Sequence, residues 1–549
     1  MIQQNFIQLY QDSFKKNWDL PALTDYKGGT SYTYGELAET IAKLHLLFSD
    51  LGIQKGDKIS LIGRNHSSWS VVFMATITYG AVIVVPILHE FNPESIEYII
   101  AHSDSKLVFV NKSLWGTMDR DNVKVPVFEI PSFALLKSDD ESVKEKMKMP
   151  DERLKSRYQE RFTKEDIRYA DVSNEEVVCI NYTSGTTGFS KGVMITANNL
   201  AGNITYGQKL NLLFTGERNL AFLPMAHIYG CTFDFLYALA TGVHITLLGT
   251  TPTPQNLIIA LKEVKPKLIF TVPLIFEKIY KKKILPIIDK PIVKVLLKIP
   301  GINNLILNKI KKSLIESLGG NFREVVIGGA ALNAEVEAFF YRMKFPFSVG
   351  YGMTECAPLI SYDHHDNFIP TSCGSVLDEI MEARIDSGDP ENIPGEIQVY
   401  GENVMKGYYK NPEATEAAFT DDGWLKTGDL GIIKDKRLFI KGRIKNMLLA
   451  ANGQNIYPEE IESRLNNLPY IAESVIVLRE YKLVALVYPD VAAVTANNIT
   501  RERLEEIMLE NKGILNKAVA HYEKIISIEI VNSEFEKTPK KSIKRFLYS

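Results

Sequence analysis

The hydrophobic positions of the first hundred residues alternate between two periods. Residues 34–51 repeat apolar side chains every three or four positions, after a Thr33–Glu36 pair with the spacing of a helix capping box. Short apolar runs and further helical patterns then follow each other, which predicts strands at 59–62, 81–86 and 106–110 and helices at 68–79 and 93–102. Apolar strands separated by helices predict a parallel or mixed sheet covered on both faces.

The pattern changes twice further along the chain. From about residue 375 to 442, short strands and turn residues predict a small β subdomain. After Arg443, a helix at 457–465, strands at 474–478 and 483–488 and helical spacing at 504–508 predict a compact α+β module. The fold class is therefore expected to be α/β and α+β multidomain.

Composition limits the kind of protein. At 549 residues the chain is expected to divide into domains, and its net charge of −3 gives it no electrostatic reason to bind nucleic acid. The four cysteines are scattered, which fits a reducing cytoplasm. The most apolar stretch, 71–88, is interrupted by threonine, glycine and proline, so a buried helix–turn–strand unit is expected rather than a membrane span. The N-terminus lacks the features of a signal peptide, and we expect a cytoplasmic protein.

The most informative chemistry lies in one loop, YTSGTTGFSKGV at 182–193. Glycines and hydroxyl side chains without an apolar period predict a loop after the strand 176–182. This loop suits a polyphosphate, because glycines let backbone N–H groups converge, hydroxyls donate hydrogen bonds and Lys191 supplies positive charge. It is not the common P-loop, since Lys191 precedes Gly192 instead of following the last glycine.

Five further motifs follow this loop in order. They are PMAHIYG at 224–230, IGGAAL at 327–332, YGMTE at 351–355, DGWLKTGDLG at 422–431 and KGRIKNMLLAANGQNIYPEEIE at 441–462. Together they resemble the adenylate-forming (AMP-binding) superfamily, which includes acyl-CoA synthetases, firefly luciferase and peptide-synthetase adenylation domains. The resemblance spans about residue 23 to the C-terminus and is strongest to long-chain fatty acyl-CoA synthetases.

The resemblance implies a two-step reaction and a two-domain architecture. AMP passes from ATP to a carboxylic acid with release of pyrophosphate, and a thiol then displaces AMP. The implied domains are a large N-terminal AMP-binding and acyl-binding domain at 1–442, with the β subdomain at about 375–442, and a small mobile C-terminal domain at 443–549. Lys445 occupies the hinge position, where a lysine would otherwise be a solvated surface residue.

The resemblance also assigns residues to the nucleotide. The β- and γ-phosphates of ATP would be held by Thr183, Ser184, Gly185, Thr186, Thr187, Gly188 and Lys191. Thr354 and Glu355 would contact the α-phosphate and Mg²⁺, a hard ion that suits carboxylate ligands. The adenine slot and its surroundings would comprise Gly329, Ala330, Tyr351, Gly352 and Met353. Asp429 would accept the ribose hydroxyls with Arg443 behind it, although a Gly-Asp pair is in general a turn.

The acid and thiol ends of the site are assigned in the same way. His227 would flank the acyl carboxylate as a positioning or gating residue, the alternative being a core histidine. Gly453 would lie on the face of the C-terminal domain that lines the pantetheine passage after rotation.

The C-terminus departs from the family pattern. In TPKKSIKR at 538–545, Ser542 occupies the slot of the catalytic lysine and Lys541 lies one residue early. Either a neighbouring lysine, for which Lys541 is the candidate, reaches the α-phosphate, or the first half-reaction is slow. The basic tail would otherwise be a solvated one.

Substrate class is inferred from the segment 276–320, where ten lysines are interleaved with apolar residues. It resembles long-chain fatty acyl-CoA synthetases, and it suits an anionic membrane surface, such as the inner face of the membrane, or an amphipathic helical hairpin on the core. The leading hypothesis is ligation of a medium- or long-chain fatty acid to coenzyme A, with ATP and Mg²⁺. The alternatives are an acyl-acyl carrier protein synthetase and a non-catalytic nucleotide- or acyl-AMP-binding protein. A homodimer is left open.

Overall fold

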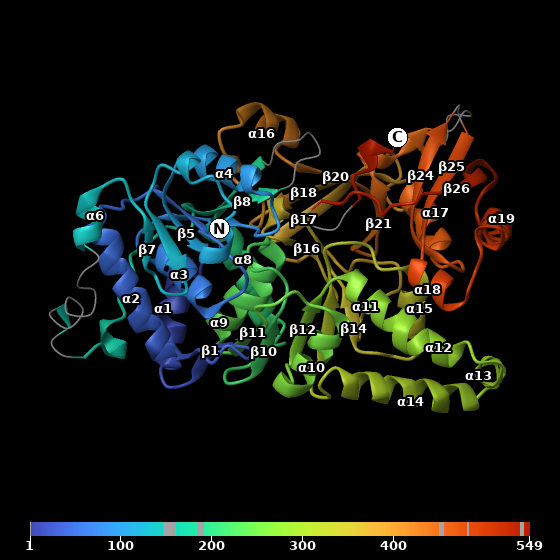
Figure 1. The fold of residues 1–549 in the computed structure, drawn as a ribbon, viewed down its shortest axis with the longest axis horizontal. Helices are drawn as coiled ribbons and strands as arrows, with labels where there is room; N and C mark the ends of the chain where they lie inside the picture. Colours follow the sequence, from blue (N-terminus) through green and yellow to red (C-terminus); the bar gives the residue numbers. More distant parts are fainter. Residues whose placement is uncertain are drawn as a thin grey trace.

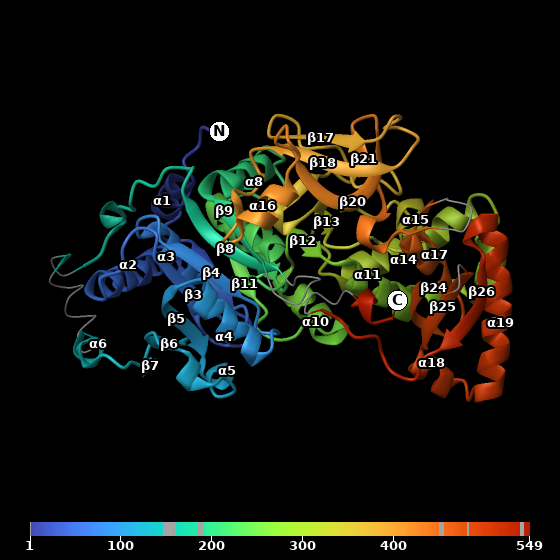
Figure 2. The same ribbon diagram turned by 90° about the horizontal axis from the view of Figure 1, so that it is seen from above.

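The computed structural model describes residues 2–146, 157–158, 161–183, 191–449, 455–479, 482–538 and 543–548. In Figure 1 the chain runs from the N-terminal region on the left, through the centre, to the C-terminal region on the right. Seen from above in Figure 2, the strands β17, β18, β20 and β21 form a layer of their own along one side.

The largest sheet has eight strands in the order β19-β9-β8-β4-β3-β5-β6-β7. The central strands β8, β4, β3, β5 and β6 are parallel, and β9, β19 and β7 pair antiparallel at the two edges. This arrangement is the mixed sheet that the alternating pattern predicts. The bounds are β3 (Lys58–Ile62), β4 (Ile83–Ile87), β5 (Ser105–Asn111), β6 (Val127–Ile130), β7 (Leu135–Lys137), β8 (Val177–Thr183), β9 (Lys191–Thr196) and β19 (Gly407–Tyr408).

Helices of the N-terminal region begin where the sequence predicts. The capping box forms at the start of α2 (Tyr34–Asp50): the Glu36 N–H donates to Thr33 Oγ1 at 3.1 Å, and the Thr33 N–H donates to Glu36 Oε2 at 2.7 Å. All residues of α3 (Ser67–Thr78) are buried and β4 follows, so the apolar stretch is a helix–turn–strand unit. Among the described helices, none combines the length and apolarity that crossing a membrane requires.

Smaller sheets complete this region. One has the order β10-β11-β1-β2, another β12-β13-β14, and a four-stranded antiparallel sheet has the order β17-β18-β20-β21. A short pair, β15-β16, precedes the last of these. The bounds are β1 (Pro21–Asp25), β2 (Ser31–Thr33), β10 (Arg218–Ala221), β11 (His244–Leu247), β12 (Leu268–Thr271), β13 (Glu324–Ile327), β14 (Phe347–Val349), β15 (Tyr351–Gly352), β16 (Leu359–Ser361), β17 (Met381–Asp386), β18 (Gly395–Gly401), β20 (Leu425–Lys434) and β21 (Arg437–Arg443).

The remaining helices of this region are mostly short. They are α1 (Phe6–Lys16), α4 (Pro93–His102), α5 (Lys112–Trp115), α6 (Glu141–Lys146), α8 (Ala197–Lys209), α9 (Ala238–Thr241), α10 (Pro254–Val264), α11 (Pro273–Ile279), α12 (Leu285–Ile288), α13 (Pro291–Leu296), α14 (Ile302–Ser317), α15 (Ala334–Arg342) and α16 (Pro412–Ala418). A π-helical turn, Gly230–Tyr237, precedes α9.

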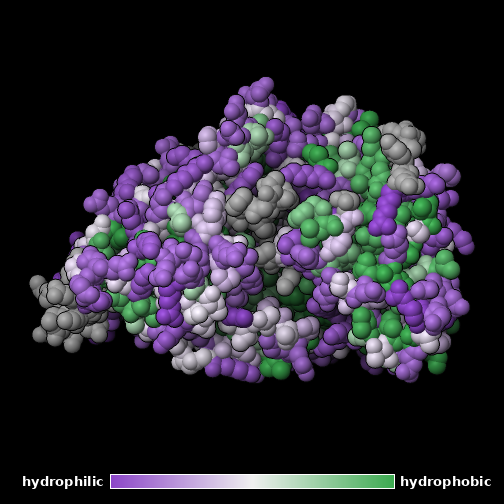
Figure 3. Space-filling view, turned by 45° about the horizontal axis from the view of Figure 1, so that its top comes forward, coloured by the Kyte–Doolittle hydropathy of each residue, from purple (hydrophilic) through white to green (hydrophobic). Residues whose placement is uncertain are grey.

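The C-terminal region is a small α+β unit. Its sheet has the order β24-β25-β26, and β22 pairs with β23 near its start. On the face shown in Figure 3, hydrophobic residues are more frequent over this side than over the N-terminal side. The bounds are β22 (Leu448–Leu449), β23 (Asn455–Ile456), α17 (Pro458–Leu465), β24 (Ile471–Arg479), β25 (Lys482–Pro489), α18 (Val491–Ala496), α19 (Arg501–Ala518) and β26 (Ile525–Ile530).

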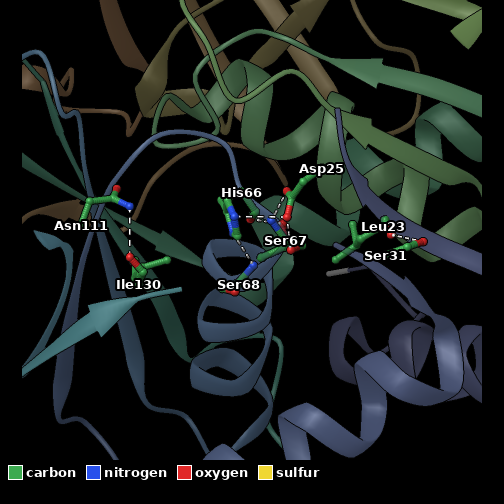
Figure 4. A network of polar contacts seen from close by, with 9 residues as sticks. Leu23, Asp25, Ser31, His66, Ser67, Ser68, Asn111 and Ile130 are labelled. Carbon is green, nitrogen blue, oxygen red and sulfur yellow. Dashed lines mark hydrogen bonds and ion pairs between the residues drawn. The ribbon is translucent and has the colours of Figure 1, made fainter. Parts of the chain in front are cut away.

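A buried aspartate joins strand β1 to helix α3 in the N-terminal region (Figure 4). Asp25, at the end of β1, accepts hydrogen bonds from the Ser67 N–H at 2.8 Å and from the Ser67 hydroxyl at 2.6 Å. His66 Nε2 lies 3.2 Å from Asp25 Oδ2, and its Nδ1 accepts from the Ser68 N–H at 3.1 Å. Asp25 therefore satisfies the first turn of α3, where backbone N–H groups lack helical partners, and ties it to β1.

Candidate active site

A large cavity of about 2150 Å³ lies between the N-terminal and C-terminal regions. Figure 3 shows a hollow near the middle of the face that it presents. Every described residue that the motifs single out lines it, namely Thr183, Lys191, His227, Gly329, Ala330, Tyr351, Gly352, Met353, Thr354, Glu355, Asp429, Arg443 and Lys445. Its volume exceeds that of a typical pocket for one drug-sized ligand, so it has room for a nucleotide together with an acyl group.

The strand pair β8–β9 carries the glycine- and hydroxyl-rich loop. Thr183 ends β8, Lys191 begins β9, and the two residues are cross-strand partners. Gly192 is required here, because a Cβ would lie 2.9 Å from Ile180 Cγ2 and 3.0 Å from Tyr182 Cζ. Ser184, Gly185, Thr186, Thr187 and Gly188 lie outside the described residues. The described ends bring a hydroxyl and an ammonium group side by side at the cavity wall.

Tyr408 connects this lysine to the carboxylate of Glu355. The Lys191 ammonium lies 4.7 Å from the centre of the Tyr408 ring, a cation–π contact. The Tyr408 hydroxyl donates to Glu355 Oε1 at 2.9 Å. Burial and the nearby Glu355 raise the pKa of Tyr408, so the hydroxyl remains a donor. One carboxylate oxygen of Glu355 is thus held in place, while a carboxylate keeps further lone pairs for a cation.

A second carboxylate is held by two partners at the other end of the cavity. Tyr351 donates its hydroxyl to Asp429 Oδ2 at 2.7 Å, and Arg443 Nε lies 3.0 Å from Asp429 Oδ1. Burial raises the pKa of Asp429, whereas Arg443 and Tyr351 act in the opposite direction. Each oxygen retains one further acceptor site, which suits two neighbouring hydroxyl groups such as those of a ribose.

His227 also lines the cavity, and a backbone contact defines its tautomer. Its Nδ1 accepts a hydrogen bond from the Tyr229 N–H at 3.2 Å, so in the neutral ring Nε2 carries the proton. Beyond it, the rings of Tyr229 and Phe233 pack against Phe270 with centroids 6.1 Å and 5.4 Å apart. This histidine can therefore donate from Nε2 and is not set up to accept a proton at Nδ1, next to an aromatic wall.

Two glycines of the cavity wall, Gly329 and Gly352, have backbone positions that leave no room for a larger residue or favour glycine. Gly329 has a φ of +86°, a conformation that favours glycine, directly after β13. Gly352 is equally constrained, because a Cβ would lie 2.1 Å from the Pro358 carbonyl oxygen. Small residues here leave a flat slot beside Tyr351, as needed for a planar ring.

A buried acid that the motifs do not indicate also lines the cavity. Glu337 of α15 accepts a hydrogen bond from the Thr371 N–H, and burial raises its pKa to about 7. Its neutral form is favoured because burial disfavours the charge. The sequence does not indicate a role for Glu337, because its spacing is that of any residue in a helix.

The C-terminal tail faces the same cavity. Lys537 and Ile543 form an isolated antiparallel bridge. The Arg545 guanidinium forms a bidentate ion pair with the buried Glu462 of α17. The described residues Thr538, Ile543 and Lys544 line the cavity. Lys541, Ser542 and Gly453 lie outside the described residues.

Sequence reasoning missed several of these residues. Tyr408, Glu337 and the aromatic wall carry no signature spacing, and Tyr408 contributes through a short edge strand far from its partners. A Gly-Tyr-Tyr run at 407–409 is the one local signal, and by itself it suggests only a strand.

The fold and this cavity define a multidomain enzyme with the architecture of the adenylate-forming superfamily. The sequence pattern of the AMP-binding enzyme family matches residues 10–409, and the chain belongs to that family. It is 28% identical over 475 residues to the long-chain-fatty-acid–CoA ligase FadD15 of Mycobacterium bovis, covering 82% of this chain and 75% of that protein. It is also 28% identical over 486 residues to 4-coumarate–CoA ligase 1 of Solanum tuberosum, covering 83% and 78%.

Solved structures share the whole architecture. The crystal structure of ATP-bound MatB from Rhodopseudomonas palustris covers 98% of this chain with a TM-score of 0.75 and 21% identity, and 98% of that chain is matched. The likeness extends over both the N-terminal and the C-terminal regions, so the fold class predicted from the sequence is confirmed.

Proposed function

We propose that this enzyme joins a medium- or long-chain fatty acid to coenzyme A, with ATP as the activating substrate and release of AMP and pyrophosphate. The observation that carries the proposal is the continuity of one cavity from Lys191 and Glu355, through Asp429, to the aromatic wall beside His227. A polar end and an apolar end in one cavity suit a nucleotide joined to an acyl group. The curated relatives include ligases for a fatty acid and for an aromatic acid, so the acid class is the finer part of the proposal.

In the first half-reaction the residues position two anions against each other. Thr183 and Lys191, with the loop between them, would bind the β- and γ-phosphates, and Asp429 would accept the ribose hydroxyls. Thr354 and Glu355 would contact the α-phosphate and Mg²⁺, with Glu355 as the metal ligand; the Glu355 carboxylate fits this ion because Tyr408 orients one of its oxygens. When bound, Mg²⁺ neutralises charge on the phosphate oxygens. His227 would donate from Nε2 to the acid and orient it.

The second half-reaction requires a different face of the C-terminal region. We place the domain boundary after residue 442 and the hinge near Lys445, with Gly453 on the face that lines the pantetheine passage. This division is supported by the packing, because the main core cluster ends with residues before 443 and the C-terminal region has apolar clusters of its own. Rotation would then let one small domain serve both steps.

We assign the adenylation lysine to the segment between Lys537 and Ile543. Lys541 is our candidate, with Ser542 in the position that the family gives to lysine. The assignment is supported by the described residues on either side of this segment, because Thr538, Ile543 and Lys544 line the cavity and Arg545 is ion-paired with Glu462 of α17.

Acid-dependent pyrophosphate release tests the proposal. The purified chain is incubated with ATP, Mg²⁺ and a panel of saturated fatty acids, 4-coumarate and a short dicarboxylic acid. We expect the largest release with a medium- or long-chain fatty acid. Greater release with the aromatic or dicarboxylic acid would overturn the substrate class while leaving the reaction type in place.

The thiol acceptor needs a separate measurement. Coenzyme A and a phosphopantetheinylated acyl carrier protein present the same thiol, so the reaction chemistry does not separate the two ligases. Mass spectrometry of the products formed with each acceptor distinguishes them. Failure to release pyrophosphate with every acid, despite ATP binding, would favour the non-catalytic nucleotide- or acyl-AMP-binding alternative. We place the protein in the cytoplasm, and size measurement in solution decides whether it is a homodimer.

Two single variants identify the adenylation lysine. We expect Lys541→Ala to lower the rate of pyrophosphate release strongly and Ser542→Ala to leave it nearly unchanged. If neither change lowers the rate, the assignment of the C-terminal segment is wrong.

A further inference from the structure

One part of the surface exposes many apolar side chains close together. It comprises α12, α13 and the first turn of α14, at the lower right of Figure 1. Ile292 and Leu305 are 75% and 71% exposed. Single exposed apolar residues are ordinary, but a run of them marks an interaction surface. We call the exposed set the apolar edge; it consists of Ile287, Ile292, Val295, Ile299, Ile302 and Leu305.

The same helices have a separate apolar face that packs on the protein. Leu285, Ile288, Leu297 and Ile306 are partly buried against the main core. An amphipathic hairpin resting on the core therefore explains this inner set and leaves the apolar edge unexplained. The short helix α13 contains no buried residue at all, although most of its side chains are apolar. An apolar helix without buried residues is typical of a surface that contacts another molecule or a membrane.

The charge around the apolar edge is strongly positive. Residues 281–312 contain nine lysines and a single acid, Asp289, in a chain whose net charge is −3. That acid is already paired, since Lys294 Nζ lies 3.0 Å from Asp289 Oδ1. Lys290 and Lys298 are exposed on the same stretch. The partner of this surface is therefore expected to be both negatively charged and apolar beneath its charged layer.

We infer that the apolar edge and its lysines dock the enzyme on a membrane that contains anionic lipids. Isoleucine and leucine side chains would enter the boundary between headgroups and acyl chains, while lysines extend their stems along it and keep their charges among the headgroups. This inference deepens the proposed function, because a fatty acid partitions into membranes and docking would bring the enzyme to its substrate.

The features favour a lipid surface over an acidic protein. The apolar edge lies at an outer end of the molecule and its residues do not line the cavity. A lipid surface requires no matching shape and accepts isolated apolar side chains spread along two helices. A protein partner needs a well-packed apolar centre, whereas here lysines are interleaved with the apolar residues throughout.

Co-sedimentation with vesicles tests this inference on the full chain. We expect binding to vesicles of phosphatidylcholine mixed with phosphatidylglycerol at low salt, and much weaker binding to phosphatidylcholine alone or at high salt, because exposed charges are screened. The triple variant Ile292→Ser/Val295→Ser/Leu305→Ser and the triple variant Lys290→Glu/Lys294→Glu/Lys298→Glu should each lower the vesicle partition coefficient about tenfold or more.

The matched control removes equally exposed apolar residues elsewhere. Ile393, Leu509 and Ile526 are 58%, 64% and 51% exposed, and the triple serine variant of these residues should bind vesicles as the unchanged chain does. All variants should keep the thermal unfolding midpoint and the pyrophosphate release measured with a fatty acid below its solubility limit. Vesicle binding does not depend on catalysis, so failure of the proposed function would leave this result standing.

Two outcomes overturn the inference. One is the absence of binding to anionic vesicles at low salt, including the case in which the chain instead forms a dimer or binds an acidic carrier protein through these residues. The other is unchanged vesicle binding by both triple variants.

Discussion

The two regions that enclose the cavity differ in how their apolar residues pack. One apolar cluster extends through the described residues from Phe6 to Leu438, whereas the C-terminal region has its own clusters, which begin at Ile456. Among the described residues, hydrogen bonds connect the two: Asn333 Nδ2 donates to Asn467 Oδ1 at 2.6 Å, and Lys281 Nζ donates to the Asn466 carbonyl at 3.4 Å. A shared core would cost much to separate, while exchanged polar contacts cost little.

This difference in packing corresponds to a difference in the roles that we propose for the two regions. Lys191, Glu355, Tyr351 and Asp429 come from the N-terminal region, where the elements share one core cluster. Thr538, Ile543 and Lys544 come from the other region and line the same cavity. In the proposed function, nucleotide binding would therefore rest on the region with the continuous core, and the change between half-reactions on the region with separate clusters.

Removing the proposed metal ligand, Glu355, should have the largest effect, because it would remove the charge neutralisation that Mg²⁺ supplies to the phosphates. We expect Glu355→Gln to lower the rate of pyrophosphate release about a hundredfold to a thousandfold, equivalent to roughly 3–4 kcal/mol. The matched control Tyr408→Phe, which removes only the hydrogen bond to Glu355 Oε1, should lower the rate about tenfold. Equal losses would mean that Glu355 acts through Tyr408 alone.

The buried acid of the N-terminal region should make stability depend on pH. Glu337 has its pKa raised to about 7 by burial, from an ordinary value of 4.5. Between these values the unfolded chain loses its proton first, so the free energy of unfolding falls as the pH rises, by up to about 3 kcal/mol. Below 4.5 both states are protonated, and above 7 no further loss follows.

The variant Glu337→Gln should abolish that contribution. The difference in unfolding free energy between it and the unchanged chain, measured by urea titration, should vary between pH 4.5 and 7 and be constant on either side. A difference independent of pH across that range would show that Glu337 is charged in the folded protein. Burial also raises the pKa of Glu462 in the C-terminal region to about 7, although Arg545 opposes this shift, so the variant is needed to isolate the contribution of Glu337.

Restricting the hinge should separate the two half-reactions. Lys445→Pro limits backbone rotation in the short Ile444–Asn446 turn, so we expect pyrophosphate release to persist while thioester formation falls about tenfold to a hundredfold. Lys445→Ala, which keeps backbone freedom, serves as the control. Single-turnover measurements with and without coenzyme A distinguish the steps, and equal loss in both would place the hinge elsewhere.

Weakening the polar contact between the regions should have the smallest effect. Asn467→Ala removes the hydrogen bond from Asn333 Nδ2 and leaves Asn333 as the N-cap of α15, and we expect a change of about 1 kcal/mol in the equilibrium between the two proposed arrangements. It should leave the thermal unfolding midpoint nearly unchanged and alter the ratio of the two half-reaction rates several-fold. A strong loss of stability would indicate that the two regions share more packing than their separate clusters indicate.

Local patterns in the sequence were sufficient for most of the N-terminal fold. The capping box before α2, the helix α4 and the buried strands β3 and β5 were predicted because capping, period and turn residues act over a few positions. The motif residues of the cavity were found because each motif is contiguous. The resemblance then supplied roles that no periodicity contains.

What the sequence by itself determined is therefore the class of fold, the order of its motifs and the family. Only the tertiary structure decided which side chains meet. Tyr408 of β19 reaches Glu355 across 53 residues, and Tyr351 of β15 reaches Asp429 of β20 across 78, and these strands belong to three different sheets. It also decided that the apolar residues of 285–306 form two faces, one packed and one exposed. Such contacts depend on packing between distant segments, and no local propensity encodes them.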